Sequence, residues 1–119
     1  MKIVRVQIVG DAADEFEELN RIVGEEQAKG VANSEHQQIL KSVKQKIELI
    51  KANPQYGDAV PKALIAKSGY DVDNLWVVDL TGYWRMLYTL KGGEVEILCF
   101  VLEIVDHERY DKIFGYRKK

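Results

Sequence analysis

The sequence predicts a single α+β domain in which a strand and two helices precede an antiparallel sheet, and a short helix follows that sheet. Near the N-terminus, β-branched residues alternate with polar ones, as in a strand. Apolar residues then recur at helical spacing as far as Ile50, and from Asn74 the period becomes that of strands. Because the strand runs follow the helical runs and do not alternate with them, the order favours a compact two-layer α+β fold.

Length and composition indicate an ordinary globular domain. The 119 residues fit one domain, which we assign to 1–119, and 46% hydrophobic with 30% charged residues is far from the balance of a disordered chain. A net charge of −2 gives no general attraction for nucleic acid. No apolar run reaches the roughly 18 residues of a membrane span, and no signal peptide is apparent, so we expect a cytoplasmic protein. Cys99 is the single cysteine, and we expect it in the core.

The first strand is predicted over residues 2–9 and ends at Gly10. Asp11 is expected to cap the helix that follows, because a short acidic side chain satisfies backbone N–H groups at a helix start. One face of this helix carries Phe16, Leu19, Ile22 and Val23. The apolar pattern then loosens from Gly24 to Val31.

A second helix is predicted to begin at Ser34, where Ser34 and Gln37 have the spacing of a capping box. Its apolar face comprises Ile39, Leu40, Val43, Ile47 and Ile50. The pair Asn53-Pro54 should end the helix, since the residue before a proline is disfavoured in the α region. A loop is expected from there to Asn74.

The C-terminal half predicts a strand meander. The strands are expected at 75–78, 84–90 and 95–104, with turns at 81–82 and 91–94. The adjacent Gly92 and Gly93 can take the positive φ angles of a tight hairpin. Asp106 should cap a last helix that runs through Ile113 and closes at Gly115. With both long helices on one face of the sheet, the other face is expected to be free for function.

An arginine in the second strand of the meander is the main functional indication. Alternation places Arg85 on one face with Leu87 and Thr89, opposite Trp84, Met86, Tyr88 and Leu90. The stretch Gly82-Tyr83-Trp84-Arg85-Met86-Leu87-Tyr88, the Gly-Gly hairpin after it, and Asp106-His107-Glu108-Arg109-Tyr110 resemble the RelE/ParE toxin superfamily. The specific motifs cover roughly the last third of the chain, and the order of elements agrees over nearly all of it.

The resemblance implies a RelE-like two-layer fold and the role of a toxin that pairs with a cognate antitoxin. Toxins of the RelE branch are endoribonucleases that cleave mRNA, usually on the ribosome, and those of the ParE branch act on DNA gyrase. The sequence leaves the branch open. Neither branch implies a cofactor, and no motif for a metal or a nucleotide is present, so we expect none.

Cleavage of RNA without a metal needs a base for the 2′-hydroxyl, a cation for the phosphate and an acid for the leaving oxygen. The resemblance assigns these roles to His107, Arg85 and Tyr110, with Tyr116 as the alternative to Tyr110. Arg85 matches the family arginine whose planar guanidinium holds the scissile phosphate. The resemblance further places Tyr83, Arg109 and Tyr116 among the substrate-binding residues.

Structural interpretations stand beside each of these. Arg85 could equally form a cross-strand salt bridge with Asp79, and His107 could be an ordinary polar residue in the first turn of a helix. Trp76 and Trp84 are typical of core positions. The strand from Leu75 to Asp79 also lacks the lysines that RelE carries there. A non-catalytic binding protein, ParE-like or degenerate, is therefore the alternative, and a housekeeping role is a third.

Overall fold

The computed structural model describes residues 2–115 and shows an α+β fold with a five-stranded mixed sheet. The elements are β1 (Ile3–Ile8), α1 (Gly10–Ala28), α2 (Glu35–Ala52), β2 (Asp58–Ala59), α3 (Lys62–Ser68), β3 (Trp76–Asp79), the 3-10 turn η1 (Thr81–Tyr83), β4 (Arg85–Gly92), β5 (Glu96–Val105) and α4 (His107–Ile113). No helix within residues 2–115 is both long and apolar enough to cross a membrane. The predicted fold class is confirmed.

The strand order is β1-β5-β4-β3-β2. The predicted meander is present as antiparallel pairs of β3 with β4 and of β4 with β5. β1 lies parallel to β5, with Val6 opposite Cys99, so the sheet is mixed and not purely antiparallel. β5 is thus flanked on both edges, as its continuous apolar run from Ile97 to Leu102 predicts. Cys99 is fully buried and free, as expected.

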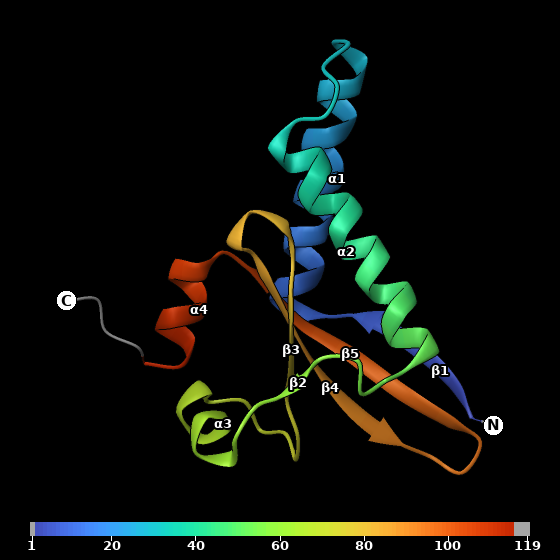
Figure 1. The fold of residues 1–119 in the computed structure, drawn as a ribbon, viewed down its shortest axis with the longest axis vertical. Helices are drawn as coiled ribbons and strands as arrows, with labels where there is room; N and C mark the ends of the chain where they lie inside the picture. The colour runs from blue at the N-terminus through green and yellow to red at the C-terminus, as the bar shows by residue number, and fades with distance from the viewer. Residues whose placement is uncertain (1, 116–119) are drawn as a thin grey trace.

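Both long helices cover one face of the sheet, as the sequence predicts (Figure 1). The core on this side contains Leu19 and Val23 from α1, Ile39, Leu40, Val43 and Ile50 from α2, and Val78, Met86, Tyr88, Cys99, Val101 and Ile104 from the strands. The end of the helical hairpin, where α1 meets α2, extends beyond the sheet (Figure 1). This main core fixes the sheet against the hairpin.

The expectation that the opposite face is free is wrong. A second apolar cluster there contains Val60, Ile65, Leu75, Leu87, Val105, Tyr110 and Phe114. Its residues come from α3, α4 and the sheet, and the two short helices lie away from the α1–α2 hairpin (Figure 1). Helix α3 lies in the segment that was expected to be a loop. Pro61 precedes it and Gly69 ends it in the left-handed conformation, which are ordinary helix boundaries.

The helix starts agree with the sequence in two of three places. Ser34 Oγ accepts a hydrogen bond from the backbone N–H of Gln37, and Asp106 Oδ1 accepts one from that of Arg109. Asp11 does not cap α1. The helix begins at Gly10 after Val9, whose carbonyl accepts from Ala13, so Asp11 lies already inside the first turn. Helix α1 also continues beyond Gly24, where the apolar pattern loosens, as far as Ala28.

The hairpin between β4 and β5 differs in detail from the prediction. Its strands pair as far as Gly92 and Ile97, and neither Gly92 nor Gly93 has positive φ. Space beside Gly93 is tight instead, since a Cβ there would lie 3.2 Å from the carbonyl oxygen of Glu96. Farther along, Leu87 pairs with Glu103 and Tyr88 with Val101, so Leu102 is the extra residue of a β-bulge.

Tyr88 ties the loop after α2 to the sheet. Its fully buried side chain donates a hydrogen bond to the carbonyl of Pro54 at 2.8 Å and accepts one from the N–H of Gly57 at 2.9 Å. Burial raises the pKa of the hydroxyl to about 12. A Cβ at Gly57 would lie 2.9 Å from this hydroxyl, so glycine is required for the close approach.

We predict that Tyr88→Phe lowers the free energy of unfolding by about 1 to 3 kcal/mol, because two buried backbone groups lose their partner. Urea denaturation measures the change. Tyr56→Phe is the control, since Tyr56 is exposed and its hydroxyl accepts a hydrogen bond from Lys46 Nζ. It should shift stability by less than about 0.5 kcal/mol. Equal losses in the two variants would contradict the assigned role of Tyr88.

Candidate functional site

Arg85 opens β4 at the end of the sheet where three strands meet. It lies opposite Asp79 at the end of β3 and opposite Val105 at the end of β5. Its Nε lies 3.3 Å from Asp79 Oδ1, so the cross-strand salt bridge weighed from the sequence is present. The side chain of Arg85 is 38% exposed and that of Asp79 84% exposed. The ion pair is therefore open to solvent and weak.

The aromatic ring of Tyr110 packs against the guanidinium of Arg85. Cζ of Arg85 lies 4.4 Å from the centre of the Tyr110 ring, a cation–π contact. Tyr110 is only 7% exposed, and its ring packs at 4.8 Å between centroids on that of Phe114 in the second apolar cluster. The residue expected to act as the acid is thus a buried aromatic that positions Arg85.

The turn between β3 and β4 holds an exposed aromatic side chain next to Arg85. Gly82 and Tyr83 both have left-handed φ, at 67° and 63°, and the strain at Tyr83 is unusual for a residue with a Cβ. The turn is fixed to α2, because Ser42 Oγ accepts from the N–H of Thr81. Tyr83 is consequently held 83% exposed. A hollow of about 460 Å³ opens here, lined by Asp79, Leu80, Gly82, Tyr83, Trp84 and Arg85.

His107 is brought to the same end of the sheet. It is the first residue of α4 and follows Val105, the strand partner of Arg85, by two positions. Its exposed ring meets that of Tyr83 edge to face, with 6.3 Å between the centroids and 71° between the planes. Arg85 and Tyr83 from one segment and His107 from another thus gather around one turn. The imidazole and the guanidinium are both accessible to solvent.

Two further residues were expected to bind substrate, Arg109 and Tyr116. Arg109 lies within electrostatic reach of Tyr70, whose hydroxyl donates to Glu103 Oε2. Burial, then this hydrogen bond and the Glu103 charge, raise the pKa of Tyr70 far above its ordinary value, and Arg109 partly opposes this. Tyr116 lies outside the described residues.

Sequence reasoning missed the Tyr70–Glu103 pair. Glu103 is 5% exposed although it is a carboxylate within an apolar strand. A glutamate within an apolar strand is the sequence feature that could have indicated this pair, because a buried carboxylate needs a hydrogen-bond donor. Nothing in the sequence indicates which donor that is, since Tyr70 lies 33 positions away.

Acidic groups near the site oppose a phosphate. Glu15 of α1 lies close enough to Asp106 for each charge to disfavour the other, and burial followed by the charges of Glu18 and Asp106 raises the pKa of Glu15. Glu108 adds a carboxylate on the first turn of α4. An anion bound to Arg85 would therefore be repelled by these nearby carboxylates.

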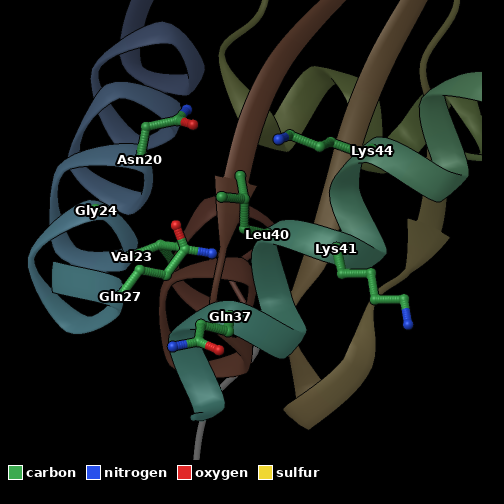
Figure 2. A pocket seen from close by; sticks show the side chains of 8 residues that line it. All are labelled: Asn20, Val23, Gly24, Gln27, Gln37, Leu40, Lys41 and Lys44. Atoms are coloured by element: carbon green, nitrogen blue, oxygen red, sulfur yellow. The ribbon is translucent and has the colours of Figure 1, made fainter. Parts of the chain in front are cut away.

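A second hollow of about 460 Å³ lies between α1 and α2, away from the Arg85 turn. Figure 2 shows amide side chains of Asn20 and Gln27 from α1 and of Gln37 from α2, together with Lys41 and Lys44. The amide of Gln37 bonds the backbone of Val31 and Asn33 and so closes the helical hairpin. Within residues 2–115 no group of three or more His, Cys, Asp or Glu side chains could hold a metal ion.

We predict that Asp79→Asn changes the free energy of unfolding by less than about 0.5 kcal/mol, because the Asp79–Arg85 pair is exposed and Arg85 keeps its contact with Tyr110. Asp58→Asn, another exposed carboxylate at a strand, is the matched control in chemical denaturation. A loss above about 1.5 kcal/mol in Asp79→Asn alone would show that the pair is a structural link and not an available cation.

The site thus consists of a solvent-accessible guanidinium and an exposed phenol that line a hollow at one end of the β4–β5 pair, and of an exposed imidazole that contacts the phenol. A cation, a base and a phenolic proton donor are the groups that metal-free phosphodiester cleavage requires. Comparison of the chain with protein-family models, curated proteins and solved structures gives no match.

Proposed function

We propose that this protein is a RelE-like toxin that cleaves mRNA, on the ribosome, without a metal ion. The observation that carries the proposal is that Arg85 and Tyr83 line one open hollow and that the ring of His107 meets the ring of Tyr83. These residues come from the two motifs that resemble the RelE/ParE superfamily. The pairing of β4 with β5 brings these two motifs together, although they lie more than twenty positions apart in the sequence.

The roles follow from exposure and chemistry. His107 takes the proton of a 2′-hydroxyl, whose oxygen attacks the adjacent phosphorus, and Arg85 binds the phosphate as negative charge builds. The bond from phosphorus to the 5′ oxygen breaks, which leaves a 2′,3′-cyclic phosphate and a 5′-hydroxyl. Tyr83 is exposed beside the hollow and is better placed than the buried Tyr110 to protonate the leaving oxygen. Tyr110 positions Arg85.

A cognate antitoxin is part of this proposal, and so is a cytoplasmic location. An antitoxin could block the site by covering the Arg85 hollow or by displacing α4. Displacement of α4 would remove His107 from Tyr83 and would withdraw Tyr110 from Arg85 together, because both residues belong to this one helix. One event would therefore disable the base and the phosphate-binding group.

We predict that His107→Ala lowers the rate of RNA cleavage by about 10² to 10⁴, because a general base contributes that much to a proton-transfer step. The measurement is single-turnover cleavage of mRNA on purified ribosomes, with mass spectrometry of the 3′ ends to identify the cyclic phosphate. Growth arrest on expression should be lost in parallel.

His36→Ala is the matched control, since His36 lies exposed on α2 and approaches Glu26. It should cleave at the wild-type rate. Arg85→Lys should lose activity comparably to His107→Ala, because an ammonium keeps the charge but lacks the planar fork. Cleavage that survives in both His107→Ala and Arg85→Lys, with the fold intact by circular dichroism, would exclude this mechanism.

A second function, a ParE-like inhibitor that binds DNA gyrase without catalysis, is favoured by the charges. β3 carries no cation, Asp79 already faces Arg85, and Glu15 and Asp106 lie near α4. We predict under the nuclease proposal that a tenfold excess of the protein leaves gyrase supercoiling of a relaxed plasmid unchanged. Inhibition by the wild type and by His107→Ala alike would favour the ParE-like function.

A further inference from the structure

The helical layer does not cover the whole of its sheet face. Helix α2 ends at Ala52, while the sheet continues toward the β4–β5 hairpin. Trp76 of β3, Leu90 of β4 and Ile97 of β5 are each only partly buried there. In the main core, by contrast, Met86, Tyr88 and Cys99 of the same strands are completely buried. The sheet therefore presents an apolar floor beyond the helix end.

This floor belongs to a hollow of about 580 Å³. Its walls are the loop Asn53–Gln55 after α2, the N-terminal Lys2, and Asn74 and Gly92 beside the strands. The volume lies within the range of about 300 to 1,000 Å³ that small-molecule sites occupy. The loop wall is firm, because Tyr88 holds the carbonyl of Pro54 and Asn53 Oδ1 accepts from the N–H of Gln55.

Trp76 supplies a hydrogen-bond donor without an acceptor. Its Nε1 is buried and has no hydrogen-bond partner among the described residues. The indole is held in place by stacking on Tyr88, with 6.3 Å between centroids and 15° between planes. The neighbouring amide of Asn74 is already engaged with Leu90 and Thr89. The Nε1 atom is shielded from solvent, so a ligand in the hollow would contact the indole ring and not this N–H group.

The charge of the lining indicates the sign of the ligand. Among the described residues that line this hollow, Lys2 alone is charged, and none is an Asp or a Glu. Within residues 2–115 no ion pair engages Lys2. The other polar lining groups are the amides of Asn53, Gln55 and Asn74. A ligand with an anionic group at the Lys2 side and an apolar body over the floor would match this distribution.

We propose that this hollow binds a small planar aromatic anion, with its ring against Trp76, Leu90 and Ile97 and its negative charge toward Lys2. The chemical class is that of aromatic carboxylates. The hollow lies at the end of the sheet away from Arg85 and shares no lining residue with that site. Binding here is independent of the nuclease proposal.

The probe is 2-naphthoate, titrated into ¹⁵N-labelled protein while the indole N–H signals are followed by NMR. The chain has two tryptophans, and the signal lost in Trp76→Phe identifies Trp76. Its signal should shift in a saturable way as the naphthyl ring approaches the indole, with a dissociation constant of about 1 mM or below, as expected for a fragment of this size. The Trp84 signal, from the Arg85 hollow, is the internal control and should stay in place.

Three comparisons decide the proposal. The neutral isostere 2-naphthalenemethanol should bind several-fold more weakly than 2-naphthoate. Lys2→Gln should weaken naphthoate binding about 3-fold or more, and Lys41→Gln, the same change at the α1–α2 hollow, should have no effect. Trp76→Phe should weaken binding about 2- to 10-fold, measured by calorimetry. A Trp76 signal that does not move, equal binding of the neutral isostere, or equal effects of the two lysine variants would each overturn the proposal.

Discussion

The antiparallel pairing of β4 with β5 positions both candidate sites. At one end it sets Arg85 opposite Val105, so the β3–β4 turn and the start of α4 become neighbours. At the other end it sets Gly92 opposite Ile97, beside the hollow at Trp76. Between these two ends, the β-bulge at Leu102 changes which face of the sheet Glu103 lies on. In a regular strand, Glu103 would share the face of Cys99 and Val101. The extra residue turns Glu103 away from the main core, toward the face where Tyr70 meets it.

The second apolar cluster determines where His107 lies. α4 is too short to be stable alone and is held by the burial of Tyr110 and Phe114, three and seven positions after His107. With those side chains against the sheet, the first residue of the helix remains in solvent. The same burial places the Tyr110 ring under Arg85. The second apolar cluster and the Arg85 site are thus coupled through α4. Loss of the packing of this helix would separate His107 and Tyr110 from Arg85.

The sequence predicted the elements whose signals are local. The Ser34 and Asp106 caps, the apolar faces of α1 and α2 and the strand alternation around Arg85 are all present. Pairing between distant segments was not predictable, because nothing local shows that β1 joins β5 in parallel. The contacts of the candidate sites likewise divide into local ones, which were predictable, and long-range ones, which were not. The Arg85–Asp79 contact was foreseen across a short turn, whereas Tyr70–Glu103 and the hollow at Trp76 depend on tertiary contacts.

The salt bridge of Arg85 with Asp79 and the binding of a phosphate by Arg85 are compatible. Asp79 meets the guanidinium at Nε, whereas the terminal amino groups form the part of the fork that a phosphate approaches from outside. An exposed carboxylate contributes little binding energy in water, so a phosphate that contacts two N–H groups can displace it or bind beside it. Asp79 and the Tyr110 ring also restrict how the guanidinium can turn. The Asp79–Arg85 salt bridge, which supports a structural role for Arg85, therefore also orients its guanidinium for an anion. The negative charges of Glu15 and Asp106 repel that anion, so its contacts with Arg85 must outweigh this repulsion.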